Sequence, residues 1–179
     1  SLVGKNKTND EMLNDSRNFL IFHAFDIIDE IEPKVVIIEN VDRFLTMKFP
    51  FDGGFYNIEY IVRKKYGDKY SINVNVYNAQ DYGVPQSRKR VIIVMCNNEY
   101  HFVEPQKEKL ITVREAIGDL PSLEAGESSN IKNHYAREHT EAHILCMKHT
   151  PTGHSAFENE VYFPKNKEGV RLKGYSATY

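Results

Sequence analysis

The sequence has few cysteines, no long apolar run and no large excess of charge, and each shortage excludes a class of protein. The two cysteines, Cys96 and Cys146, are far apart, which excludes a disulfide scaffold and indicates a reducing compartment. No apolar run is long enough to span a bilayer, and the N-terminus lacks signal-peptide character. We therefore expect a cytoplasmic protein without a membrane partner. A formal net charge of −2 offers no bulk positive field, so any surface for nucleic acid has to be local.

The chain also lacks internal repeats and low-complexity tracts, and its 179 residues suit one domain plus part of another. It opens without an initiator methionine in a polar, aperiodic segment over 1–14, so we expect a piece of a longer protein. From residue 122 the composition is polar, histidine-rich and weakly periodic. We therefore expect a regular domain over 1–121 and the start of an irregular domain over 122–179.

A short apolar segment, Val35–Ile38, follows Pro33 and ends in Glu39 and Asn40. Four consecutive β-favouring residues bounded in this way predict a strand that is buried on both faces, as in parallel sheets. In open α/β sheets, ligands bind just beyond the carboxyl ends of the strands. A carboxylate is costly at the end of a buried strand unless it has a function, so we interpret Glu39 and Asn40 as site residues.

The remaining pattern predicts an α/β domain. One helix ends before Pro33, a turn region surrounds Gly53, a second helix stops at Gly67, and strands follow over 70–76 and 91–95. This strand–helix–strand order predicts a right-handed crossover in a parallel sheet. The expected apolar positions are Leu20, Ala24, Ile27, Ile28 and Ile31 in the first helix, and Phe55, Ile58, Ile61 and Val62 in the second.

The segment between the last two strands is longer than a hairpin turn needs, and long ordered connections are usually functional. It contains Asp81-Tyr82-Gly83-Val84-Pro85 followed by Gln86-Ser87-Arg88-Lys89-Arg90. Together with Glu39-Asn40-Val41 at the earlier strand end, these motifs resemble those of the cytosine-5 DNA methyltransferase family.

Four further stretches are similar to segments of that family. Ser1–Lys5 resembles the segment directly after the family's catalytic Pro-Cys-Gln, and Asp15–Asn18 resembles the motif that follows it. Val113–Ile117 with Leu120-Pro121 resembles the end of the catalytic core. Gly174–Tyr179 resembles a late stretch of the target-recognition region. The resemblance covers residues 1–121 most closely.

The resemblance implies a particular α/β fold and domain organisation. Residues 1–121 are expected to be the C-terminal part of a Rossmann-like, S-adenosylmethionine-dependent methyltransferase domain, with a mixed sheet that has a β-hairpin edge. Residues 122–179 are expected to be part of a small, irregular target-recognition domain. The implied partner is double-stranded DNA.

The chemistry of the family explains why these residue types are needed. A thiolate adds to C6 of cytosine, and the resulting enamine attacks the methyl sulfonium of S-adenosylmethionine. Negative charge develops towards N3 and O2, where a carboxyl group and a guanidinium stabilise it. By resemblance, Glu39 faces N3 and the 4-amino group, Arg90 faces O2, and Arg88 contacts the neighbouring backbone or braces the site. The base cannot be reached inside a duplex, so the resemblance also implies base flipping.

The resemblance assigns further residues to the substrate and the cofactor. Asn40 is expected to hold the catalytic loop, and Arg17 to grip a phosphate, although it can instead be a simple partner of Asp15. The expected substrate- and DNA-binding residues are Asn40, Gln86, Ser1, Gly4, Lys5 and Arg17, and Leu20 is the expected cofactor contact.

Several parts of the family pattern are missing from these residues. The chain contains no Pro-Cys-Gln nucleophile and no Gly-rich cofactor turn, so we expect the chain alone to be inactive. The first interpretation is an excerpt of a prokaryotic restriction-modification methyltransferase. The second is one subunit of a split enzyme that a chain carrying the N-terminal half completes, and the third is a non-catalytic DNA-binding relative. A tRNA cytosine-5 methyltransferase is a further alternative because it shares the pocket motifs.

The histidines of the C-terminal part offer a competing hypothesis. His139, His143, Cys146 and His149 follow helical spacing, with His134 and His154 nearby, which is a possible zinc site. The spacing matches no common zinc module, so we predict DNA contact or plain surface here and no metal.

Overall fold

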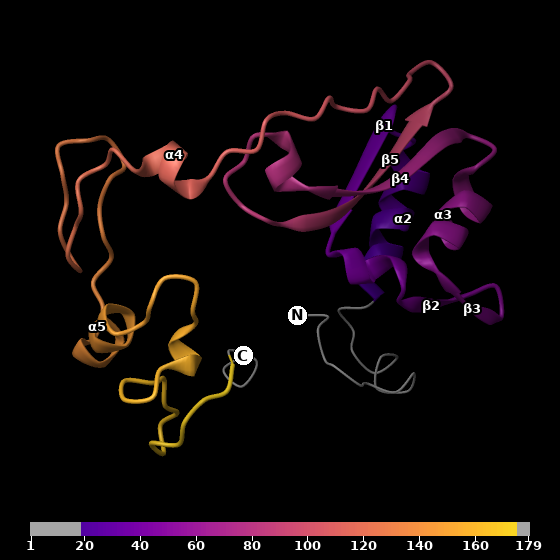
Figure 1. The fold of residues 1–179 in the computed structure, drawn as a ribbon. Helices are drawn as coiled ribbons and strands as arrows, with labels where there is room; N and C mark the ends of the chain where they lie inside the picture. The colour runs from indigo at the N-terminus through magenta and orange to yellow at the C-terminus, as the bar shows by residue number, and fades with distance from the viewer. Residues whose placement is uncertain (1–18, 175–179) are drawn as a thin grey trace. The chain divides into compact units, whose positions relative to one another are not determined.

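The computed structural model of the chain describes residues 19–174. The chain divides into two compact units, unit 1 over Ser1–Gly118 and unit 2 over Asp119–Tyr179 (Figure 1). No helix within 19–174 has the length and apolar character needed to cross a bilayer. The predicted site residues that lie outside the described part are Ser1, Gly4, Lys5 and Arg17.

Unit 1 is built on a three-stranded sheet in the order β1-β5-β4, which confirms the α/β class. The strands are β1 (Val35–Asn40), β4 (Tyr70–Asn78) and β5 (Lys89–Asn97), and β5 runs antiparallel to both neighbours. β1 and β4 therefore point the same way, but the expectation that they form a parallel pair is wrong. The central position between two strands suits β5 because its segment 91–96 is almost entirely buried.

The expectation that β1 is buried on both faces is also wrong. Its residues alternate between exposed and half-buried, with Val35 42% and Ile37 67% exposed. Val36 and Ile38 pack against the core from the other face. Within residues 19–174, β1 pairs along one edge only, so neither its free edge nor its outer face has the cover that a central strand receives.

A two-stranded hairpin occupies the region that the sequence suggested was a turn. It consists of β2 (Lys48–Phe51) and β3 (Gly54–Asn57), joined through Asp52 and Gly53. Both linking residues have positive φ, 48° and 73°, as a type I′ hairpin turn requires. Phe55, expected in the second helix, therefore lies in β3. The Asp-Gly pair is the local signal that the sequence analysis missed.

The second helix, α3 (Ile58–Tyr66), agrees with the prediction. Asn57 caps its first turn by accepting a hydrogen bond from the backbone N–H of Tyr60 at 2.8 Å, and Gly67 ends it. Its expected apolar residues Ile58, Ile61 and Val62 are fully buried.

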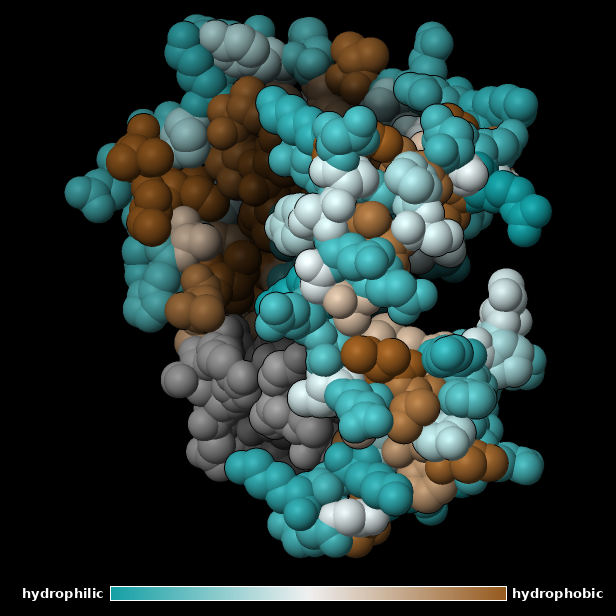
Figure 2. Space-filling view, turned by 90° about the vertical axis from the view of Figure 1, so that its left-hand side faces the viewer, coloured by the Kyte–Doolittle hydropathy of each residue, from teal (hydrophilic) through white to brown (hydrophobic). Residues whose placement is uncertain are grey.

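The first helix, α2 (Leu20–Ile31), buries Ile28 as predicted but only part of the predicted stripe. Leu20, Ile27 and Ile31 are 56–63% exposed, whereas Phe25 and Ile28 are buried. The aromatic rings explain the choice, because Phe22 and Phe25 pack edge-to-face with each other and reach Phe49 and Tyr66. Figure 2 looks onto the side of unit 1 that carries β1 and shows a broad hydrophobic area there. The exposed apolar side chains are Leu20, Ile27 and Ile31 on α2, and Val35 and Ile37 on the face of β1 that points away from the core.

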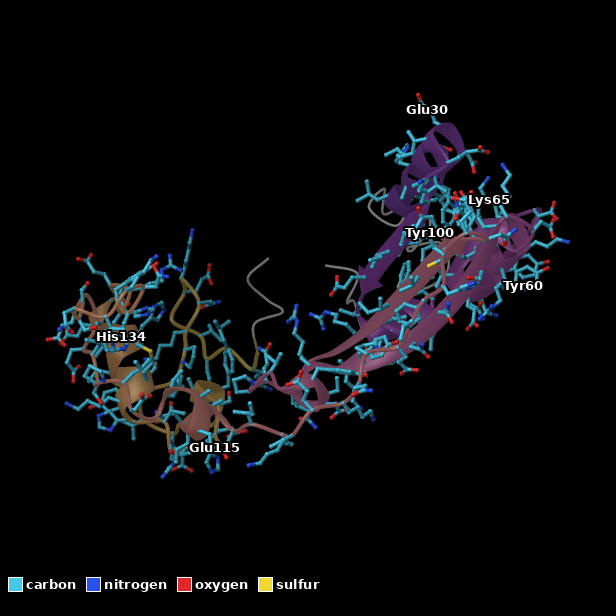
Figure 3. All side chains as sticks on the ribbon, turned by 90° about the horizontal axis from the view of Figure 1, so that it is seen from above. Glu30, Tyr60, Lys65, Tyr100, Glu115 and His134 are labelled. Atoms are coloured by element: carbon cyan, nitrogen blue, oxygen red, sulfur yellow. The ribbon has the colours of Figure 1, made fainter. Side chains whose placement is uncertain are left out.

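Both helices cover the same face of the sheet. Alternate β5 residues Val91, Ile93 and Met95 are fully buried in the core cluster that also contains Phe25 of α2 and Ile61 of α3. At the rim, Lys65 of α3 donates a hydrogen bond to Asp29 of α2 at 2.6 Å, and Figure 3 labels this lysine. The hydrogen bond from Lys65 lowers the pKa of Asp29 below its ordinary value.

The remaining residues up to 174 form little regular structure. The short helix α4 (Val113–Ile117) ends unit 1 and begins with a capping box between Thr112 and Glu115. Unit 2 contains α5 (Glu141–Lys148), the 3-10 turn η4 (Ala156–Glu158) and isolated β-bridges.

Candidate functional site

Glu39 and Arg90 meet on one face of the sheet. The register pairs Glu39 of β1 with Ile92 of β5, so Arg90, two residues away on β5, points to the same face on a diagonal. Arg90 Nε lies 2.8 Å from Glu39 Oε1, and Arg90 Nη1 donates a hydrogen bond to the carbonyl of Lys89 at 2.7 Å. Two residues that the sequence analysis singled out from separate strands thus form an ion pair.

The ion pair is open to a ligand. The side chain of Arg90 is 23% exposed and that of Glu39 is 54% exposed. Within residues 19–174, Oε2 of Glu39 and Nη2 of Arg90 make no hydrogen bond. The ion pair therefore keeps one carboxylate oxygen as an acceptor and one guanidinium nitrogen as a donor, which suits a planar ligand with a donor and an acceptor along one edge.

β4 adds polar groups that the sequence analysis did not identify. Asn75 and Tyr77 stand opposite Ile92 and Arg90, and so on the same face as Glu39. Asn75 Nδ2 donates a hydrogen bond to the Tyr77 hydroxyl at 3.2 Å, and the Tyr77 ring packs edge-to-face on Tyr82 at 5.6 Å. The sequence signal that could have found these side chains is the alternation of polar with apolar residues along β4.

Tyr82 belongs to η3 (Ala79–Tyr82), the first turn of the connection between β4 and β5. Burial raises the pKa of its phenol above the ordinary value, and the neighbouring Tyr77 adds to the shift. Tyr82 therefore stays neutral at physiological pH and can donate a hydrogen bond.

This face of the sheet is distinct from the core face. The core cluster contains Val91, Ile93 and Met95 of β5, and these residues alternate with Arg90 and Ile92. The helices that pack on the core side therefore do not cover the Glu39–Arg90 pair.

The connection between β4 and β5 carries two more of the predicted residues. Gln86 and Arg88 are exposed, and the side chain of Arg88 forms no ion pair or hydrogen bond within residues 19–174. The backbone of this segment is tied down, because the N–H of Gln86 donates to the carbonyl of Val84 at 2.7 Å and the N–H of Arg88 donates to Asn78 Oδ1 at 2.8 Å. Both side chains are thus displayed on an ordered backbone.

Asn40 and Leu20, two further predicted site residues, do not lie with the Glu39–Arg90 pair on this face of the sheet. Alternation along β1 turns Asn40 to the opposite face from Glu39, and its Oδ1 accepts a hydrogen bond from the N–H of Val41 at 2.9 Å. Leu20 lies in the first turn of α2 with a 62% exposed side chain.

Three of the histidines considered for a zinc site in unit 2 instead contact protein side chains. His134 Nδ1 lies 2.8 Å from Ser129 Oγ, His154 pairs with Glu158 at 2.9 Å, and the His149 ring stacks on Tyr162. No three His, Cys, Asp or Glu side chains converge as a metal site in the described part of the chain.

Comparison with known proteins gives a consistent result. The family described as C-5 cytosine-specific DNA methylase matches residues 1–179. Type II methyltransferase M1.HgaI of Avibacterium volantium is 41% identical over 179 residues, which are 100% of this chain and 50% of that protein. Type II methyltransferase M1.HphI of Haemophilus parahaemolyticus is 33% identical over 142 residues, 78% of this chain and 37% of that protein. The chain thus spans half or less of the length of these relatives.

A solved structure has a similar fold. It is a crystal structure of a prophage-encoded DNA modification methyltransferase from E. coli, with a TM-score of 0.51 and 20% identity, and the match covers 74% of this chain and 39% of the other. At this identity the likeness concerns the fold.

Proposed function

Because the chain belongs to the C-5 cytosine-specific DNA methylase family, we propose that the intact protein is a DNA (cytosine-5-)-methyltransferase of a prokaryotic restriction-modification system. It acts in the cytoplasm on double-stranded DNA and methylates C5 of a cytosine flipped out of the duplex. S-adenosylmethionine supplies the methyl group when it is bound. Residues 1–121 form the C-terminal part of the catalytic core, and 122–179 form part of the target-recognition domain.

The Glu39–Arg90 pair carries this proposal. A flipped cytosine presents N3, the 4-amino group and O2 along one edge, and a carboxyl group beside a guanidinium matches that edge. The 2.8 Å approach of Arg90 to Glu39 holds both groups in place before a base arrives. Such preorganisation stabilises developing charge without further rearrangement.

Each residue has a defined role in the proposed site. Glu39 binds N3 and the 4-amino group, and Arg90 binds O2, where negative charge accumulates as the ring is attacked at C6. Arg88 and Gln86, displayed on the β4–β5 connection, contact the DNA around the flipped nucleotide. The exposed side chain of Leu20 is available for an adenosyl group, although the other contacts to the cofactor have to come from elsewhere.

The nucleophile must also be supplied from outside these residues, since the chain contains no Pro-Cys-Gln. A segment that carries the nucleophile and most of the cofactor site packs against the exposed apolar side chains of α2 and of β1. The exposed apolar side chains of both elements and the edge of β1 that has no partner strand within residues 19–174 support this assignment, because such groups are a liability in water unless something covers them. The segment belongs either to the same polypeptide or to a complementing chain, and residues 1–179 alone are inactive.

Thiol labelling of the intact protein tests whether such a segment packs on β1. A cysteine introduced by Ile37→Cys reacts slowly if the surface is covered, whereas Glu30→Cys, at an exposed position of α2, reacts at the rate of a free thiol. Equal rates at the two positions would show that nothing packs on β1.

Trapping tests the reaction itself. The intact protein, with S-adenosylmethionine, is incubated with duplex DNA that contains 5-fluorocytosine, and a covalent protein–DNA complex that survives denaturation is expected. No complex and no methyl transfer to DNA would reject the proposal. Transfer to tRNA alone would favour the tRNA methyltransferase alternative, and DNA binding without transfer would favour the non-catalytic relative.

A further inference from the structure

Asn78 links the two ends of the β4–β5 connection, the segment that carries Gln86 and Arg88. It is the last residue of β4 and pairs with Lys89, the first residue of β5. Its Oδ1 accepts a hydrogen bond from the N–H of Arg88 at 2.8 Å, and its Nδ2 lies 3.5 Å from Ser87 Oγ. The next residue, Ala79, donates its N–H to the carbonyl of Arg88 at 3.0 Å. The end of β4 therefore holds both the N–H and the C=O of Arg88.

The side-chain amide of Asn78 accepts the hydrogen bond that a backbone carbonyl would accept if the ladder continued by one more residue pair. The ladder between β4 and β5 ends at Asn78 and Lys89, and the segment 79–88 leaves the sheet. Asparagine side chains readily mimic a peptide group in this way. Without the amide acceptor, the N–H of Arg88 would lose its partner and the exposed end of the hairpin would open more easily.

The effect falls on Arg88 more than on Arg90. Arg90 lies inside the sheet, where Tyr77 pairs with it and the ladder between β1 and β5 begins beside it. Arg88 lies outside the ladder, its side chain is exposed, and that side chain makes no hydrogen bond or ion pair within residues 19–174. An arginine with a held backbone and a free guanidinium is placed to reach a ligand.

We propose that Asn78 is a positioning residue, which fixes the peptide group of Arg88 so that its guanidinium meets the DNA backbone beside the flipped cytosine. This role rests on the proposed function, since it assumes that Arg88 contacts DNA. The ordinary alternative is that Asn78 only closes a hairpin.

A double-mutant cycle in the intact protein distinguishes these two roles. Asn78→Leu removes the acceptor at nearly constant volume, and loss of one such hydrogen bond is expected to weaken DNA binding and raise KM for DNA by roughly three- to tenfold. In an Arg88→Ala background the same substitution should change neither value, because the guanidinium that Asn78 positions is gone. Asn78→Asp keeps the acceptor and should restore binding.

Several outcomes would overturn the proposal. They are additive effects of Asn78→Leu and Arg88→Ala, failure of Asn78→Asp to restore binding, or unchanged binding in Asn78→Leu. If Asn78→Leu does not fold, which thermal denaturation reveals, the cycle is run with the milder Asn78→Ala.

The same measurements separate this proposal from the proposed function. If the unmutated protein binds DNA without transferring a methyl group, the methyltransferase proposal fails and the binding cycle still decides the role of Asn78. If it does not bind DNA, both proposals fail.

Discussion

Arg90 Nε lies 2.8 Å from Glu39 Oε1, although the two residues come from strands that are separated in the chain by a hairpin, a helix and a third strand. The antiparallel register of β1 and β5 sets them on a diagonal on one face of the sheet. Substitutions that keep the fold and remove one charged group test what this pair does.

Replacing Arg90 by alanine in the intact protein should lower kcat for DNA methylation by about 10²–10³-fold, the usual effect of losing one donor to developing negative charge. Glu39→Gln should also reduce kcat, because the group beside N3 changes. Lys89→Ala is the matched control, since this side chain is exposed and its carbonyl still accepts from Arg90. Equal rates for Arg90→Ala and the unmutated protein would remove Arg90 from the site.

The interior of unit 1 should be sensitive to truncation. Ile61 of α3 is 0% exposed, so Ile61→Ala is expected to reduce the free energy of unfolding by about 2–5 kcal/mol. Ile117→Ala removes the same atoms from a side chain that is 54% exposed and should cost less than about 1 kcal/mol. Urea denaturation of both variants measures the difference, and similar midpoints would contradict the assigned core.

The hairpin turn depends on the left-handed backbone of Gly53. Its φ is 73° and nothing lies within 4 Å of a Cβ built there, so Gly53→Ala adds backbone strain without a clash. The expected loss of stability is about 1–2 kcal/mol. Gly174 also has open space around it but no positive φ, so Gly174→Ala should be close to neutral in the same urea titration. Equal losses would show that the turn conformation is not required.

Acid should weaken the contact between α2 and α3. The hydrogen bond from Lys65 lowers the pKa of Asp29 below the unfolded value of about 3.9, so the contribution is complete above that pH and is lost as pH falls through the folded value. Both side chains are partly exposed, 47% for Asp29 and 31% for Lys65, which limits the effect to less than about 1 kcal/mol.

Stability measured against pH in Asp29→Asn checks this expectation. The substitution should remove that part of the acid-side loss, whereas Asp68→Asn, at an exposed residue with no ion pair within 19–174, should leave it unchanged. An unchanged profile in Asp29→Asn would contradict the linkage.

Local signals in the sequence were enough to locate α2, α3 and the three strands of the main sheet, as well as the Glu39 and Arg90 that meet in the site. A proline before an apolar run marks β1, a glycine marks the end of α3, and Thr112 with Glu115 is a capping-box pattern at the start of α4. The Asn57 cap of α3 was missed, because Phe55 was expected inside that helix. Each signal acts between residues a few positions apart, so it can be recognised without knowing the fold. The motifs around Glu39 and Arg90 are likewise visible as runs of residue types.

Only the tertiary structure decided which strands became neighbours and which apolar side chains became core. β5 inserted between β1 and β4, and α2 buried Phe25 instead of Ile27, because pairing and packing depend on residues far away in the chain. The same long-range pairing set Arg90 beside Glu39 and gave Asn78 its hold on Arg88. The sequence alone determined the chemical groups, and the register of the sheet determined their distances, since side-chain direction in a strand has meaning only relative to its partner.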